Sequence, residues 1–215
     1  MSQPPIVHLV DDDESVRRAL TRLLTAAGHR VTAYESAGAY LSAEVAEGPG
    51  CLVLDVRMPE VGGLELQQQL ARSSRERPIV FISAHGDVPT SVRAMKAGAV
   101  DFLTKPVGEE ELLSAVARAL SRDTEERLKR EADQTLWDRV ARLSARERKI
   151  FELVSSGLLN KQIGARLGTG ERTVKLHRAR VMKKLGAEST ADLVRIAERL
   201  GIEDRGVSPL DIRKQ

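Results

Sequence analysis

Cysteine, aromatic residues and long apolar runs are scarce in this 215-residue chain. Cys51 is the only cysteine, which excludes an internal disulfide and any zinc site built from several thiolates, and which favours a reducing cytoplasm. One tryptophan, two tyrosines and three phenylalanines are few for a protein that stacks single-stranded bases. No apolar run approaches ~18 residues, and the N-terminal sequence lacks the basic start of a signal peptide, so we expect no membrane contact.

The net charge of +3 is small, but it is unevenly distributed. Basic and acidic residues number 13 and 16 over 1–122, 5 and 6 over 123–142, 13 and 7 over 143–203, and 3 and 2 over 204–215. We predict an acidic domain, a helical linker, a basic domain and a flexible tail with these boundaries. A small basic domain is typical of nucleic-acid binding, although an uneven solvated surface is the alternative.

The first 120 residues alternate between two hydrophobic periods. Five short runs rich in valine and isoleucine predict strands: Ile6–Val10, Val31–Tyr34, Cys51–Asp55, Ile79–Ser83 and Val100–Leu103. Helical patterns separate them: Glu14–Ala27, Ala37–Glu44, Leu64–Arg72, Val88–Ala97 and Glu109–Leu120. Continuous apolar strands are buried on both faces, so five β/α units predict a doubly wound five-stranded parallel sheet of the flavodoxin-like class.

The remaining chain is predicted to be entirely helical. A charged stretch from about 121 to 142 favours a helical connector, with a flexible linker as the alternative. Ser144 and Glu147 form a capping-box pattern that restarts a helix. Four helical segments follow, at Ala145–Ser156, Lys161–Leu167, Glu171–Leu185 and Thr190–Leu200. The glycine-containing turn between the second and third predicts a helix-turn-helix in a small all-α domain.

Acidic, hydroxyl and basic side chains follow the predicted strands at their carboxyl ends, where a doubly wound sheet places its ligand site. These residues are Asp11, Asp12, Asp55, Ser83 and Lys105. Clustered carboxylates repel each other unless a cation is present, and Mg²⁺ suits a few carboxylates together with phosphate. A carboxylate beside such a cation can attack a phosphoryl group, which a lysine and a hydroxyl would stabilise. Asp13 is interpreted instead as the N-cap of the next helix.

The same residues resemble the receiver domain of bacterial response regulators over about residues 5–120. The matching motifs are Val10-Asp11-Asp12, Asp55-Val56-Arg57-Met58-Pro59, Ser83-Ala84 and Lys105-Pro106. The stretches His85–Pro89, Ala94–Ala99 and Asp101-Phe102 narrow the resemblance to the FixJ type. The resemblance also implies a cis peptide bond before Pro106.

The resemblance implies a role for each pocket residue. Asp55 is the acceptor of a phosphoryl group from a sensor histidine kinase. Mg²⁺ is held by Asp55, Asp12 and the Arg57 carbonyl, with Asp11 acting through water. Ser83 and Lys105 contact the phosphoryl group, and Phe102 takes the switch position without a tyrosine hydroxyl. Phosphorylated receivers usually form homodimers, for which the plausible cross-dimer charges are Arg93, Lys96 and Asp101, with solvated surface as the alternative.

The predicted helix Glu171–Leu185 has an apolar back and a basic front. At 100° per residue, Val174, His177, Val181 and Leu185 share the core side. The opposite side has Arg172, Lys175, Leu176, Ala179 and Lys183. Such a helix fits a DNA major groove. There Lys175 would donate to guanine edges, and Leu176 and Ala179 would pack on thymine methyl groups. The phosphates would be contacted by Arg172, Arg180 and Lys183.

Residues 143–202 resemble the LuxR-type helix-turn-helix domain, with the motif itself at Asn160–Ala179. The resemblance adds four residues to the expected DNA interface: Asn160, Lys161, Thr173 and Arg178. Gly170 stands where the family often has a serine cap, and Gly164 stands in place of alanine at an expected cost of up to ~1 kcal/mol.

Together the two resemblances predict a two-component response regulator of the NarL/FixJ family, a non-enzymatic transcription factor that binds double-stranded promoter DNA and works with RNA polymerase. Two alternatives stay open. A DNA-binding regulator with a vestigial receiver would respond to protein contacts alone. An Asp-nucleophile phosphatase would want a second acid two residues after Asp55, where Arg57 stands.

Overall fold

The computed structural model describes residues 4–43, 48–73, 77–84 and 86–202. His85, the end of the predicted helix at Glu44 and the predicted tail 204–215 lie outside these ranges. The chain divides into two compact units, Met1–Arg127 and Leu128–Gln215, each of which is described by itself. No helix in the described ranges is long and apolar enough to cross a membrane.

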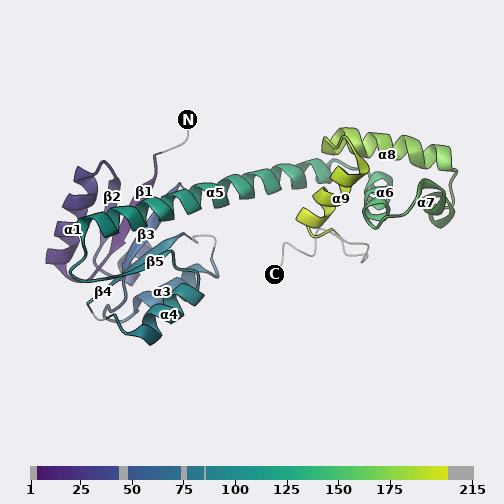
Figure 1. Cartoon of the computed structure of the whole chain (residues 1–215). Coiled ribbons are helices and arrows are strands. Elements are labelled where there is room, and N and C mark those ends of the chain that lie inside the picture. The colour runs from purple at the N-terminus through teal and green to yellow at the C-terminus, as the bar shows by residue number, and fades with distance from the viewer. Residues whose placement is uncertain (1–3, 44–47, 74–76, 85, 203–215) are drawn as a thin grey trace. The chain divides into compact units, whose positions relative to one another are not determined.

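The first unit is built on a five-stranded parallel sheet in the order β2-β1-β3-β4-β5 (Figure 1). Its strands are β1 (Ile6–Val10), β2 (Arg30–Tyr34), β3 (Gly50–Asp55), β4 (Ile79–Ser83) and β5 (Asp101–Thr104). The helices are α1 (Glu14–Ala26), α2 (Ala37–Ser42), α3 (Gly63–Leu70), α4 (Val88–Lys96) and α5 (Glu109–Ala141). The predicted doubly wound fold is confirmed.

Both faces of the sheet are covered by helices, as continuous apolar strands require. Helices α1 and α5 pack on one face, where Leu24, Leu112 and Val53 belong to the same buried apolar cluster. Helices α2, α3 and α4 pack on the other face, where Leu66 and Leu54 belong to a second buried apolar cluster. Because all five strands run in parallel, their carboxyl ends lie at one edge of the sheet. The predicted pocket residues lie at these strand ends and in the loops that follow them.

Several local predictions are confirmed, and helices α2 and α3 each end two residues before the predicted position. Asp13 caps α1, since its side chain accepts from the backbone amides of Ser15 and Val16. The Lys105–Pro106 peptide bond is cis, as the receiver resemblance implied. Helix α2 was expected to reach residue 44 but ends at Ser42, because Ala43 is already extended.

Helix α5 is a single helix of 33 residues and includes the predicted connector. Asp123 lies in the charged stretch, yet it is only 1% exposed. Its Oδ2 accepts from the Gly50 amide at 2.9 Å and from Arg127 Nε at 3.0 Å. These contacts join α5 to the start of β3, so the first unit includes residues beyond the predicted boundary at 122.

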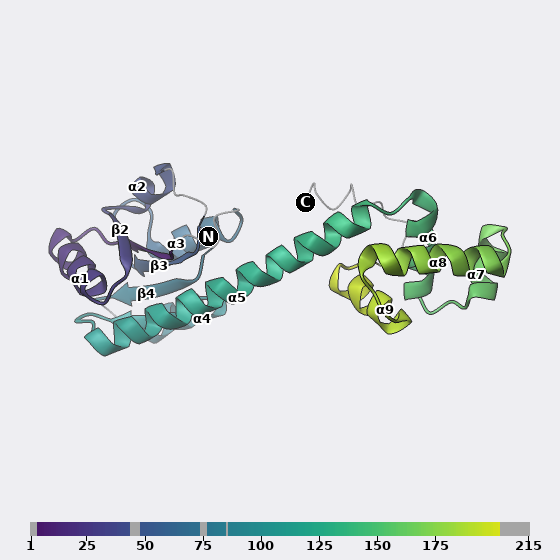
Figure 2. The same ribbon diagram turned by 90° about the horizontal axis from the view of Figure 1, so that it is seen from above.

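The second unit consists of the end of α5 with α6 (Ala145–Ser155), α7 (Asn160–Leu167), α8 (Glu171–Leu185) and α9 (Thr190–Arg199) (Figure 2). Ile150, Val174 and Leu193 are buried in its core. The predicted Ser144–Glu147 capping box is present at the start of α6. These elements confirm the predicted small all-α domain.

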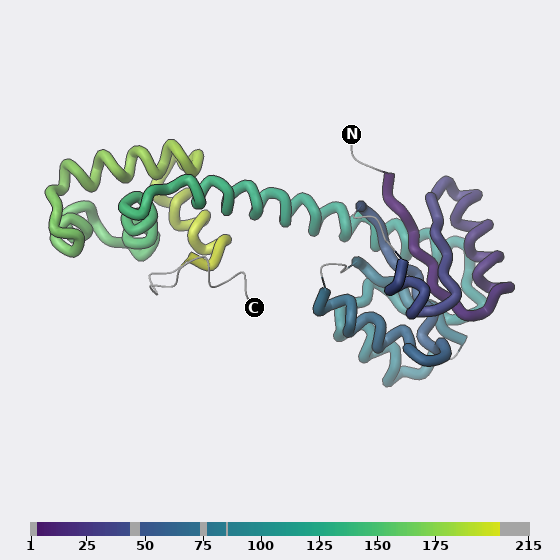
Figure 3. The backbone as a smooth tube through the Cα atoms, turned by 180° about the vertical axis from the view of Figure 1, so that it is seen from behind, coloured from purple at the N-terminus to yellow at the C-terminus, as the bar shows by residue number. Residues whose placement is uncertain are grey.

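Helices α7 and α8 are joined by the tight turn expected of a helix-turn-helix, which the backbone tube of Figure 3 follows. Gly168 ends α7 in the left-handed conformation. Gly164 was expected to cost stability, but the structure gives a reason for glycine there. A Cβ atom at Gly164 would lie 2.7 Å from the Thr169 carbonyl oxygen, so an alanine would push the turn outward.

Candidate metal centre and nucleic-acid interface

Three carboxylates meet at the carboxyl edge of the sheet. One oxygen from each of Asp11, Asp12 and Asp55 lies within 4.8 Å of the others. Asp11 is fully buried, Asp55 is 6% exposed, and Asp12 is exposed. Three convergent carboxylates with one side open to solvent fit a hard divalent cation that keeps several waters.

Lys105 lies between two of these carboxylates. Its Nζ donates to Asp11 Oδ2 and to Asp55 Oδ2, each at 2.7 Å. Burial raises the pKa of Asp11, and the hydrogen bond from Lys105 opposes that shift. Burial alone would lower the pKa of Lys105, but its hydrogen bonds to Asp11 and Asp55 raise it overall. The lysine therefore stays charged and partly neutralises the pocket.

Backbone contacts hold the loops around this pocket. The Asp13 amide donates to Asp11 Oδ1 at 2.9 Å, and the Arg57 amide donates to Asp55 Oδ1 at 3.2 Å. Ser83 is fully buried at the end of β4, where its carbonyl accepts from the Lys105 amide at 2.8 Å. The structure thus brings Asp11, Asp12, Asp55 and Lys105 together and places Ser83 on the neighbouring strand end.

Phe102 lies on β5 and is half-buried. Its ring packs against Phe81, with the two ring centroids 6.2 Å apart. It belongs to the apolar cluster on the α2, α3 and α4 side of the sheet. Phe102 has no hydroxyl group, so packing against these apolar neighbours holds its side chain.

The expected cross-dimer residues differ in their surroundings. Arg93 and Lys96 are exposed on α4 and have no ion pair within the described part of the chain. Asp101 instead forms an ion pair with Arg118 of α5, which sequence reasoning missed. The same helix α4 exposes an apolar stripe at three positions one turn apart: Val88, Val92 and Met95.

Helix α8 has the predicted two faces. Its buried residues are Val174, Val181 and Leu185, and His177 is half-buried beside them. The expected contact residues on the front are all exposed: Arg172, Thr173, Lys175, Leu176, Ala179 and Lys183. An exposed apolar Leu176 among basic side chains suits a groove that offers thymine methyl groups.

Two expected DNA contacts lie next to each other. Arg178 Nη1 donates to Asn160 Oδ1 at 3.1 Å, and Arg178 Nη2 donates to the Thr190 hydroxyl. The guanidinium therefore joins the starts of α7 and α9 to the middle of α8. Sequence reasoning missed this contact because helical spacing does not show which cations bond within the domain.

The basic residues of the second unit differ in whether their side chains are bonded within the unit. One group is engaged in ion pairs: Lys149 with Glu152, Lys184 with Glu147, Arg195 with Asp192, and Arg199 with Asp133. A second group makes no side-chain hydrogen bond or ion pair to the described residues: Lys129, Arg130, Arg142, Lys161, Arg172, Lys175, Arg180 and Lys183. Four of these eight lie on α8, so that helix has more positive charge free to meet an anion than any other helix of the second unit.

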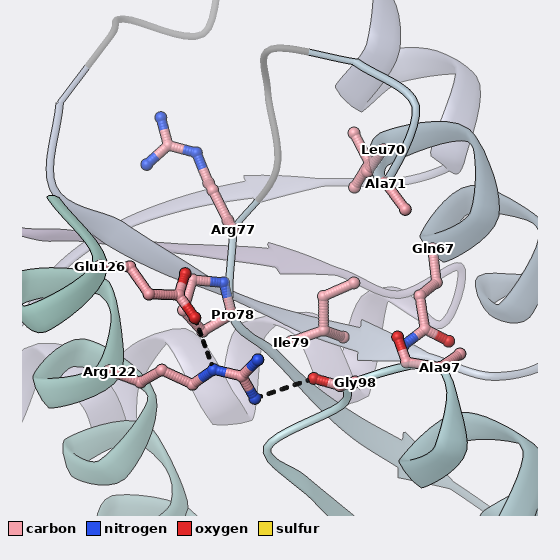
Figure 4. Close-up of a pocket in the computed structure, with 10 residues that line it drawn as sticks. All are labelled: Gln67, Leu70, Ala71, Arg77, Pro78, Ile79, Ala97, Gly98, Arg122 and Glu126. Carbon is pink, nitrogen blue, oxygen red and sulfur yellow. Dashed lines mark hydrogen bonds and ion pairs between the residues drawn. The ribbon is translucent and has the colours of Figure 1, made fainter. Parts of the chain in front are cut away.

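A cavity of about 50 Å³ lies in the first unit between α3, α5 and the start of β4 (Figure 4). Arg122 spans part of its lining, because Nε donates to Glu126 at 2.8 Å and Nη1 donates to the Gly98 carbonyl at 3.0 Å. Gln67 closes another side and donates to the Ala97 carbonyl at 3.2 Å. None of the predicted site residues lines this cavity.

Comparison with known proteins assigns a family to each unit. Residues 7–117 match the response regulator receiver domain, and residues 141–208 match the bacterial regulatory proteins of the luxR family. Nodulation protein W of Bradyrhizobium diazoefficiens is 49% identical over 94% of this chain and 88% of its own length. Transcriptional regulatory protein FixJ of Azorhizobium caulinodans is 43% identical over 91% of this chain and 93% of its own length.

Solved structures show the same combination of domains. Response regulator StyR is 47% identical, with a TM-score of 0.76, and the match covers 92% of this chain and all of that one. Full-length FixJ from B. japonicum is 38% identical, with a TM-score of 0.55, and covers 95% of this chain.

Proposed function

The chain belongs to the bacterial response regulators that combine a receiver domain with a LuxR-type DNA-binding domain, and from its pocket we propose that a sensor histidine kinase phosphorylates Asp55. As a member of this family it is a phosphorylation-dependent transcriptional regulator. The observation that supports Asp55 is its carboxylate, which is nearly buried and bonded to Lys105 beside two further acids.

The transfer uses residues already in place. An Asp55 oxygen attacks the phosphorus, the bond to the donor histidine nitrogen breaks, and an acyl phosphate forms. Lys105 and Ser83 then stabilise the added phosphoryl oxygens. Asp11, Asp12, Asp55 and the Arg57 carbonyl would hold Mg²⁺. When bound, this cation offsets the repulsion between the carboxylates and the incoming phosphoryl group.

Phosphorylation replaces the single negative charge of the Asp55 carboxylate with about two negative charges on the phosphoryl oxygens. We propose that Ser83 is drawn to the phosphoryl group and that Phe102 shifts in its packing against Phe81. The α4 surface then forms a homodimer through its exposed apolar stripe. Arg93 and Lys96 would pair with Asp101 of a second copy, which requires Asp101 to leave Arg118.

The second unit would read promoter DNA with α8 in the major groove. Lys175, Leu176 and Ala179 face bases, and the phosphates are met by Lys161, Arg172, Thr173 and Lys183. Asn160 and Arg178, which are hydrogen-bonded to each other, would also contact DNA. A dimer would bind a two-fold site and act on RNA polymerase in the cytoplasm.

Phosphoryl transfer at Asp55 would serve regulation and not substrate turnover. The relative FixJ is a transcriptional regulatory protein by name, and Arg57 stands where an Asp-nucleophile phosphatase would have its second acid. Steady-state hydrolysis of a phosphate ester would revive the phosphatase alternative.

Labelling with a small phosphodonor in the presence of Mg²⁺ tests the acceptor. The wild-type chain should incorporate about one phosphoryl group, and Asp55→Asn should incorporate none because its amide is a poor nucleophile. Asp138→Asn is a matched control, since Asp138 is exposed on the part of α5 that belongs to the second unit and should leave labelling unchanged. Labelling of Asp55→Asn would refute the assignment, and an unlabelled wild-type chain would favour a vestigial receiver.

A further inference from the structure

Arg17 on α1 is directed to the backbone of the acidic pocket. Its Nη1 donates to the Asp11 carbonyl oxygen at 2.8 Å, and the side chain is half-buried. No carboxylate within the described ranges pairs with it. The next residue, Arg18, is 74% exposed and lies 3.7 Å from Glu14 on the outer surface of the helix. Two adjacent arginines therefore have different environments.

The bond from Arg17 fixes the peptide that links Asp11 to Asp12. A peptide unit is planar, so holding its carbonyl oxygen also orients the amide of the following residue. Asp11 is restrained at other atoms as well, because its amide donates to the Tyr34 carbonyl and its Oδ1 accepts from the Asp13 amide.

Asp12 depends on this backbone more than its neighbours do. Its side chain is exposed and makes no hydrogen bond to the described residues, whereas Asp11 and Asp55 are both held by Lys105. The position of the Asp12 carboxylate therefore depends on the main chain from which it extends and on its own rotamer, and not on a side-chain partner. An arginine on the preceding carbonyl is placed to restrict that position.

We propose that Arg17 is a positioning residue that orients the Asp11–Asp12 segment for the divalent cation, an inference that rests on the proposed function of the pocket. The Arg17 side chain makes no hydrogen bond to the carboxylate of Asp11, Asp12 or Asp55. It therefore acts only through the Asp11 carbonyl oxygen. Its charge by itself would repel a cation. Positioning by Arg17 would strengthen Mg²⁺ binding, whereas its positive charge would weaken it. The direction in which Mg²⁺ affinity changes when Arg17 is replaced therefore tests the proposal.

Mg²⁺ titration of the full chain by calorimetry, without phosphodonor, measures this direction. Replacing groups that orient metal ligands typically weakens binding by about 10–100-fold, so we expect about tenfold weaker affinity in Arg17→Met. Arg17→Lys keeps a donor and the charge and should recover part of the loss, while lacking the fixed guanidinium geometry. Arg18→Met removes the same charge from the outer surface and should bind Mg²⁺ like the wild type.

Two outcomes would overturn the proposal: unchanged affinity in Arg17→Met, or tighter binding caused by loss of the positive charge. If Arg17→Met fails to fold by circular dichroism, Arg17→Lys decides, because wild-type affinity in that variant would equally refute positioning. Wild-type protein that binds no Mg²⁺ would refute the proposed pocket itself, whereas wild-type binding that Asp12→Asn abolishes and Arg17→Met retains would refute Arg17 alone.

Discussion

The ion pair between Glu147 and Lys184 should make the stability of the second unit depend on pH. Lys184 Nζ lies 2.6 Å from Glu147 Oε2, and the Glu147 side chain is only 5% exposed. The hydrogen bond from Lys184 and then that from the Ser144 amide lower the pKa of Glu147 to about 2. Glu147→Gln removes the charge and keeps an amide oxygen that can still accept from Ser144.

The expected loss follows from the bond to the charged partner. Hydrogen bonds to charged groups contribute about 1.5–3 kcal/mol, so Glu147→Gln should lose about 2 kcal/mol at pH 7. The pKa of Glu147 is lower in the folded state than its ordinary value of 4.5. The contribution is therefore complete above pH 4.5 and lost as the pH falls toward about 2, where variant and wild type should converge.

Urea unfolding followed by tryptophan fluorescence provides the assay. Trp137 is the only tryptophan and packs against the core of the second unit, so its emission reports that unit. With a slope of about 1–3 kcal/mol per M, the midpoint at pH 7 should fall by about 1 M. Glu198→Gln makes the same charge change at an exposed position of α9 and should change the free energy of unfolding by less than about 0.5 kcal/mol. An equal midpoint for Glu147→Gln and wild type, or a difference that persists at pH 2, would refute the reasoning.

Three further outcomes are expected. Lys175→Ala should weaken specific DNA binding by about 1–3 kcal/mol at matched salt, and equal affinity in a fluorescence titration would remove Lys175 from base readout. Leu159→Ser should raise the free energy of unfolding of the second unit by about 1 kcal/mol, because Leu159 is 69% exposed and leaves α7 without a side-chain cap. A lowered urea midpoint would contradict this. Asp123→Ala should destabilise the first unit by about 2–4 kcal/mol in circular dichroism melts, since it leaves the Gly50 amide and Arg127 without their acceptor; a change below about 0.5 kcal/mol would oppose that account.

The sheet and the acidic pocket could be predicted because their signals are local. Each buried strand is a continuous apolar run, and the parallel order brings the strand ends together. The positions of Asp11, Asp55 and Lys105 at those ends then followed from the topology. The buried and exposed sides of α8 followed from helical periodicity in the same way.

Contacts between distant charged residues could not be predicted. Asp123 lies in a run where seven of nine residues are charged, which indicates solvent exposure, yet it is buried against Gly50. Arg178 was assigned to DNA without any sign of its bonds to Asn160 and Thr190. Such contacts depend on how side chains from elements far apart in sequence are directed toward each other. The hydrophobic periodicity of a single helix or strand gives no information about these directions.

The most direct test of the account measures size and DNA affinity together, with and without a small phosphodonor and Mg²⁺. Sedimentation of the wild-type chain should show a monomer that becomes a dimer on phosphorylation, with DNA binding tightened in parallel, while Asp55→Asn stays monomeric and weakly bound. A wild-type chain that is labelled at Asp55 yet changes neither its size nor its DNA affinity would contradict the central claim that phosphorylation controls DNA binding.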